Sequence, residues 1–219
     1  MLNNFKYILY LIVIIGFSYS YGGSYEDFFK AIQFDDDRTV QNLLNRGFDP
    51  NTPDPNLQHP LYLAIREPAP KITRLLISHP SIKVDVRNKD DETPLMMAAL
   101  KGQLEVAQRL VDLKADINKP GWAPLHYAAT SGNPALVRLL LEHDAYPDAE
   151  SPNGSTPLMM AAMYGTPATV KVLLEAGADP TLRNNLDLSA LDFAQRASRQ
   201  DSAMLISAFL LGWSKDSPK

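Results

Sequence analysis

The chain has 219 residues, of which 45% are hydrophobic and 21% are charged, with 21 basic and 25 acidic side chains. This composition is that of an ordinary folded protein, and a net charge of −4 lacks the basic surplus that attracts nucleic acid. Because the sequence contains no cysteine, it excludes disulfides, thiolate catalysis and lipid attachment to cysteine.

The first twenty residues have the pattern of a secretory signal peptide. Lys6 supplies a positive start, residues 7–17 form an apolar run, and Ser18-Tyr19-Ser20 has the small-x-small pattern of a cleavage site. The apolar run is shorter than the ~20 residues of a permanent membrane span, so cleavage is favoured over an uncleaved anchor. We therefore expect a periplasmic protein of a bacterium, or alternatively an extracellular one.

An opening unit over residues 24–53 follows, and its apolar residues recur at helical spacing in two groups. Phe28 and Ile32 belong to the first group, and Val40 and Leu43 to the second, which predicts two helices. The acidic run 35–37 lies directly before the second helix. Negative charge stabilises a helix N-terminus, so we expect capping here rather than a cation site.

Beyond this unit one phrase returns five times. Its proline, or the alanine that replaces it in the last copy, recurs at intervals of 34, 30, 33 and 33 residues. A fixed period of this length is typical of stacked-repeat proteins, in which each unit buries its apolar face against its neighbours. The five copies lie at residues 59–64, 93–99, 123–129, 156–162 and 189–194.

Each phrase predicts a short inner helix, because proline suits the first helical position and Thr93 or Thr156 can cap it. After a glycine, apolar residues recur at helical spacing and predict an outer helix. In the outer helix that follows the phrase at residues 93–99, this apolar face contains Leu104, Leu110 and Val111.

Polar stretches at residues 85–92, 148–155 and 181–188 connect each outer helix to the next inner one. Turn dipeptides such as Asn153-Gly154 predict hairpin-like fingers there. The connection at residues 119–122 is three residues short and predicts a trimmed finger. Trp122 at its end either belongs to a binding surface or covers the space that the missing residues leave.

The phrase resembles the ankyrin repeat, whose T-P-L-H-x-A opening is matched by Ala123 to Ala129 and, with methionine for histidine, by Thr93 to Ala99. The signal sequence adds a resemblance to bacterial periplasmic ankyrin proteins. The implied fold is an all-α solenoid of stacked helix-turn-helix units with β-turn fingers. We expect a signal peptide at 1–20, a repeat domain at 21–212 and a tail at 213–219. Within the repeat domain we expect a first cap at 24–53, repeats at 54–87, 88–118, 119–150 and 151–183, and a last cap at 184–212.

The sequence offers no set of residues for catalysis. It contains neither a G-x-S-x-G motif nor a phosphate-binding glycine loop, and its histidines lack metal-ligand spacing. The resemblance implies a structural hydrogen bond for His126, which Ala123 in place of threonine removes or reroutes. We therefore predict a protein that is not an enzyme and that has no catalytic residue, cofactor or metal site.

In ankyrin proteins a partner protein usually lies against the concave side of the stack, which the inner helices and finger tips form. The resemblance thus implies a non-enzymatic interaction module or scaffold, with another protein of the cell envelope as its partner. A secreted protein that binds a host target is the alternative. Neither nucleic acid nor, after signal cleavage, a membrane is an expected partner, and the oligomeric state stays open. The implied contact residues are Arg66, Leu100, Lys101, Trp122, Thr130, Met163, Tyr164 and Arg196.

Overall fold

A computed structural model describes residues 23–216 of the chain. In this range the chain consists of helices joined by turns, with one isolated antiparallel β-bridge between Arg183 and Ser189. The predicted all-α repeat fold is confirmed. None of the helices in residues 23–216 is long and apolar enough to cross a membrane. The predicted signal peptide at 1–20 lies outside the described residues and stays a prediction.

The chain divides into two compact units, which meet in the sequence at Lys83 and Val84. In the first unit, α4 packs against both α2 and α3. Asp36 caps α2, as expected, because its carboxylate accepts the Thr39 N–H at 3.2 Å. The first unit contains a helical segment at 23–33, α2 (Asp37–Asn45), α3 (Pro60–Arg66) and α4 (Pro70–Ile77).

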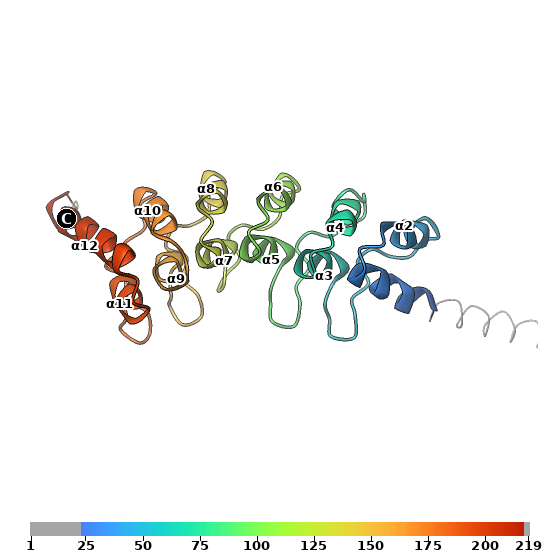
Figure 1. The fold of residues 1–219 in the computed structure, drawn as a ribbon, viewed down its shortest axis with the longest axis horizontal. Helices are drawn as coiled ribbons and strands as arrows, with labels where there is room; N and C mark the ends of the chain where they lie inside the picture. The colour runs from blue at the N-terminus through green and yellow to red at the C-terminus, as the bar shows by residue number, and fades with distance from the viewer. Residues whose placement is uncertain (1–22, 217–219) are drawn as a thin grey trace, which may run out of the picture. The chain divides into compact units, whose positions relative to one another are not determined.

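The second unit is built from two rows of helices, as Figure 1 shows. Helices α5, α7, α9 and α11 pack side by side and form the inner row, while α6, α8, α10 and α12 form the outer row. Their bounds are α5 (Pro94–Leu100), α6 (Leu104–Asp112), α7 (Pro124–Ser131), α8 (Pro134–Glu142), α9 (Pro157–Tyr164), α10 (Pro167–Glu175), α11 (Ala190–Arg196) and α12 (Gln200–Asp216).

The phrase residues begin the inner helices in the predicted way. Thr93 accepts the Met96 N–H at 3.3 Å and Thr156 accepts the Met159 N–H at 3.4 Å, each with proline at the first helical position. The alanine pairs of the phrases at 98–99, 128–129 and 161–162 are completely buried. Their small size lets neighbouring inner helices pack closely.

Two glycines end inner helices for different reasons. Gly132 has a φ of 73°, the left-handed conformation that suits glycine after a helix. Gly165 has a negative φ, but a Cβ atom there would lie 2.5 Å from the carbonyl oxygen of Ala129 on α7. Close approach of α7 therefore requires glycine at position 165.

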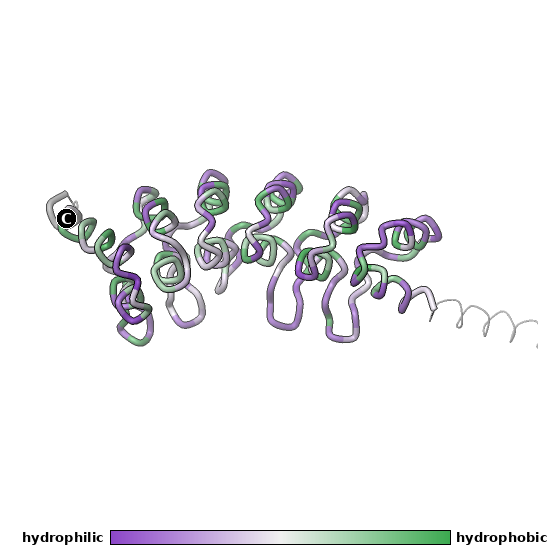
Figure 2. Tube along the Cα trace, in the orientation of Figure 1, coloured by the Kyte–Doolittle hydropathy of each residue, from purple (hydrophilic) through white to green (hydrophobic). Residues whose placement is uncertain are grey.

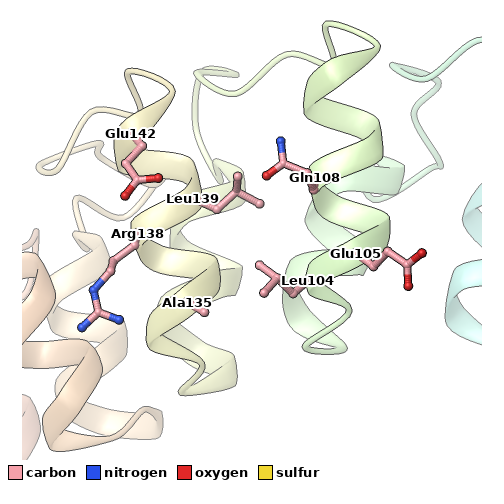
Figure 3. A pocket seen from close by; sticks show the side chains of 7 residues that line it. All are labelled: Leu104, Glu105, Gln108, Ala135, Arg138, Leu139 and Glu142. Atoms are coloured by element: carbon pink, nitrogen blue, oxygen red, sulfur yellow. The ribbon is translucent and has the colours of Figure 1, made fainter.

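The outer helices bury the predicted apolar residues with one exception. Leu110 and Val111 are buried, but Leu104 remains 39% exposed, so the prediction that it belongs to the buried face was wrong. Leu104 is the first residue of α6. At this helix end its side chain points toward α8, as Figure 3 shows.

Candidate partner-binding surface

Most of the predicted contact residues lie at the C-terminal ends of the inner helices in the second unit. Because these helices pack side by side, their ends form a row, which we call the inner-row surface. Leu100 is 36% exposed and Tyr164 is 51% exposed, and the other members of the row are at least partly exposed. The inner-row surface consists of Leu100, Lys101, Thr130, Met163, Tyr164 and Arg196.

Arg66 occupies the corresponding position at the end of α3 in the first unit. Its guanidinium forms an ion pair with Glu67 at 2.7 Å and donates a hydrogen bond to the Gln58 side-chain oxygen at 2.9 Å. The guanidinium carbon also lies 5.9 Å from the centre of the Tyr62 ring. Arg66 thus has several partners within its own unit.

Trp122 stands apart from the row, because it lies just before α7 whereas Thr130 lies near the other end of that helix. The eight residues of α7 correspond to roughly 12 Å of helix. The half-buried indole contacts the His126 ring edge to face, with ring centres 5.2 Å apart. Trp122 therefore covers His126 and also presents part of its surface to solvent.

His126 connects its own helix to the next finger. Its Nδ1 accepts the backbone N–H of Ala123 at 3.1 Å, so its Nε2–H donates to the carbonyl oxygen of Ser155 at 3.0 Å. The bond that threonine would otherwise provide is thus rerouted to the backbone of Ala123. Burial lowers the pKa of His126 below its ordinary value, which keeps the ring neutral for these bonds.

A buried lysine holds the short connection at residues 119–122 to the preceding finger. Lys119 is 3% exposed, forms an ion pair with Asp91 of the preceding finger and donates to the Pro120 carbonyl oxygen at 3.1 Å. The hydrogen bond from Lys119 holds the pKa of Asp91 below its usual value. Sequence reasoning missed this link, because a lysine next to Pro-Gly is expected to face solvent.

A second link joins α7 to the same finger. The Tyr127 hydroxyl donates to Glu92 Oε1 at 3.2 Å, and Asn88 donates to Glu92 Oε2 at 2.9 Å. Burial, together with the negative charge of Glu92, raises the pKa of the Tyr127 phenol. The finger at 85–92 is therefore held to the following repeat from two sides.

The opposite side of the second unit carries a shallow groove between α6 and α8, with a volume of about 510 Å³. Figure 3 shows Leu104 and Leu139 pointing toward one another across it, while Glu105 and Arg138 point away. Within residues 23–216 no three side chains of histidine, aspartate and glutamate gather to hold a metal ion. The groove is lined by Leu104, Glu105, Gln108, Ala135, Arg138, Leu139 and Glu142.

Comparison with known proteins finds relatives that match only part of this chain. The chain is 43% identical over 74 residues to the 26S proteasome non-ATPase regulatory subunit 10 of Dictyostelium discoideum, which is 32% of this chain and 32% of that protein. It is 31% identical over 115 residues to the neurogenic locus notch homolog protein 1 of Xenopus tropicalis, which is 51% of this chain and 5% of that protein. The chain thus spans a third or less of these relatives.

A solved structure matches over more of the chain. It is a chain of the complex between the predatory endopeptidase Bd0816 of Bdellovibrio bacteriovorus and the immunity protein Bd3460, with a TM-score of 0.72 and 28% identity. The match covers 83% of this chain and 97% of that one. The sequence also matches the family described as ankyrin repeats (3 copies) over residues 28–120 and 118–184, which is well over half of its length. The chain belongs to the ankyrin repeat family.

Proposed function

We propose that this protein is an exported, non-enzymatic binding module that holds another protein against its inner-row surface. The observation that carries the proposal is the exposure of apolar side chains on helices that are otherwise buried. Tyr164 and Leu100 are 51% and 36% exposed, beside the partly exposed Met163. Apolar surface with a polar rim is typical of interaction sites, and tyrosine often contributes much of the binding energy.

The rim of this surface carries positive charge. Lys101 follows α5 and Arg196 ends α11, and both are exposed. Thr130 between them donates its hydroxyl to the His126 carbonyl oxygen at 2.8 Å, so it offers chiefly its methyl group to a partner. A partner with an apolar centre and acidic flanks complements this arrangement.

The proposed compartment is the bacterial periplasm, on the strength of the apolar run and the small-x-small pattern in residues 1–20. Fractionation followed by N-terminal sequencing tests it. We expect a chain beginning at Tyr21 in the periplasmic fraction. A chain that retains Met1 in that fraction would contradict cleavage, and recovery from the culture medium alone would favour the extracellular alternative.

For the partner we propose a protein of the cell envelope, and an exported peptidase is the specific candidate that the comparison favours. The matched chain comes from a complex of an endopeptidase with an immunity protein, and the match covers 97% of that chain. A host protein met after secretion is the alternative. Peptidase activity in the envelope fraction, measured with and without the purified protein, separates the two proposals. Only a peptidase partner predicts that the purified protein inhibits this activity.

Affinity capture from the envelope fraction tests the surface. Tyr164→Ala should weaken binding of the captured partner at least tenfold, because a tyrosine in the centre of an interface is often worth more than ~2 kcal/mol. Tyr146→Ala is the matched control, since Tyr146 is 65% exposed and follows the outer helix α8. Equal effects of the two substitutions would overturn the assignment of the inner-row surface.

A further inference from the structure

The last helix of the stack has one buried face and, opposite it, exposed apolar residues. One face packs on α10 and α11, where Ser202 and Ile206 are 2% and 0% exposed. On the opposite side Met204 and Leu211 are 65% and 74% exposed. Figure 2 shows hydrophobic residues along α12, and the sequence has no charged residue between Asp201 and Lys215. Terminal units of repeat stacks usually carry a polar outer face, so this face is exceptional.

The exposed residues of α12 follow the spacing of a helix-pairing seam. Asp201, Met204, Ala208 and Leu211 are separated by three, four and three positions, and all four are exposed. Alternation of three and four is the pattern that places side chains along one line of a helix for packing against a second helix. Lys215 continues this pattern in the sequence, two heptads after Asp201.

We propose that this seam binds a second copy of the chain, with two α12 helices packed antiparallel around a two-fold axis at Ala208. The small side chain at the axis lets the helices approach closely. Met204 of one copy then packs near Leu211 of the other, so the apolar surface is self-complementary, as a two-fold interface requires.

The sequence carries opposite charges at helix positions 201 and 215, which favours the antiparallel arrangement. In that arrangement the position of Asp201 in one copy faces the position of Lys215 in the other, and the two helix dipoles also run in opposite directions. A parallel pair would instead place like charges together at both ends. The helix carries no charged residue between positions 201 and 215. An unrelated acidic or basic partner would therefore find no complementary charge along this stretch.

The seam is short, and this sets the strength of the contact. One helix pair buries less than the roughly 1,200 Å² of a standard stable interface, so the expected dissociation constant is micromolar or weaker. The inner-row surface lies on other helices of the same unit. Self-association and partner binding are therefore separable, and either can fail without the other.

Sedimentation of the full chain over a range of concentrations tests the proposal. Leu211→Glu should weaken dimerisation at least tenfold, because it places a charge in the apolar seam. Leu186→Glu is the matched control, since Leu186 is 72% exposed but lies on the finger at 181–188. A wild-type chain that stays monomeric at several hundred micromolar, or equal weakening by both substitutions, would overturn the proposal.

A cross-link tests the position of the axis, because the chain has no cysteine of its own. Ala208→Cys should give a covalent dimer under mild oxidation at least tenfold faster than Leu186→Cys, since a residue on a two-fold axis faces its own copy at disulfide distance. Equal rates for the two variants would contradict the antiparallel pair. Binding to neutral lipid vesicles that Leu211→Glu abolishes, without any dimer, would assign the face to a membrane surface instead.

Discussion

The buried ammonium group of Lys119 and the carboxylate of Asp91 form an ion pair between two neighbouring connections of the stack. The two residues differ greatly in exposure, because the Lys119 side chain is 3% exposed and the Asp91 side chain is 56% exposed. Water can therefore solvate Asp91 when the pair is broken but cannot reach Lys119 to the same extent. The two ends of this ion pair should respond differently to substitution.

Asp91→Ala is expected to lower the free energy of unfolding by about 1–3 kcal/mol, because it leaves a buried charge without its counter-ion. Lys119→Met should cost less, since methionine fills similar space and the freed carboxylate faces solvent. Urea unfolding of both variants measures the difference. A larger loss for Lys119→Met would show that the ammonium group is fully satisfied by backbone carbonyls.

The same pair makes a prediction for titration. The hydrogen bond from Lys119 is the largest cause of the lowered pKa of Asp91, so Lys119→Met should move that pKa upward toward 3.8. NMR titration of the Asp91 carboxyl carbon checks this. Because the pKa is lowered in the folded state, the pair contributes stability above pH 3.8, and this contribution is lost as the pH falls through the folded value.

His126 predicts a second dependence of the free energy of unfolding on pH, in this case through a base rather than an acid. Its pKa is lowered from 6.5, chiefly by burial, so the unfolded chain binds a proton more readily than the folded chain. The free energy of unfolding should therefore fall as the pH decreases below about 6.5, until the folded value is reached. Urea unfolding from pH 7.5 to pH 5 should show this slope in the wild type and a flatter one in His126→Gln.

The repeat fold could be predicted from the sequence because its signals are local. Pro94 and Pro157 begin helices wherever they stand in such a phrase, and the period of about 33 residues reports the stacking directly. The partner of Lys119 could not be predicted, because Asp91 lies 28 positions earlier in another finger. The exposure of Leu104 was missed for a related reason, since hydrophobic spacing does not tell where a helix extends beyond the core.

A repeated side-chain bond joins successive connections along the chain. In the first unit Asn51 donates to the Ser81 carbonyl oxygen and accepts the Lys83 N–H, at 2.9 Å and 2.8 Å. In the second unit Asn118 makes the same two bonds, but Asp148 only accepts the Asp179 N–H, at 2.9 Å. A carboxylate cannot donate to the neighbouring carbonyl as an amide does.

Asp148→Asn should therefore raise the free energy of unfolding by about 1 kcal/mol at pH 7, through one added hydrogen bond to the backbone at Gly177. Burial raises the pKa of Asp148, so its charged form is unfavourable in the folded state at neutral pH. The advantage of asparagine should shrink as the pH falls and Asp148 becomes protonated. Asp85→Asn is the control, because Asp85 accepts a similar bond but is exposed, and it should gain less. A loss of stability in Asp148→Asn would contradict the second bond.

The register of the outer helices predicts the largest single effect on stability. Leu110 of α6 is fully buried, so Leu110→Ala should lower the free energy of unfolding by about 2–5 kcal/mol through lost apolar burial and the cavity left behind. Leu113 follows the same helix and is 44% exposed, so Leu113→Ala should cost less than about 1 kcal/mol. Urea unfolding of both variants measures the two losses side by side. Similar values would mean that Leu110 does not face the inner row, and the stacking of α6 on α5 would need a different register.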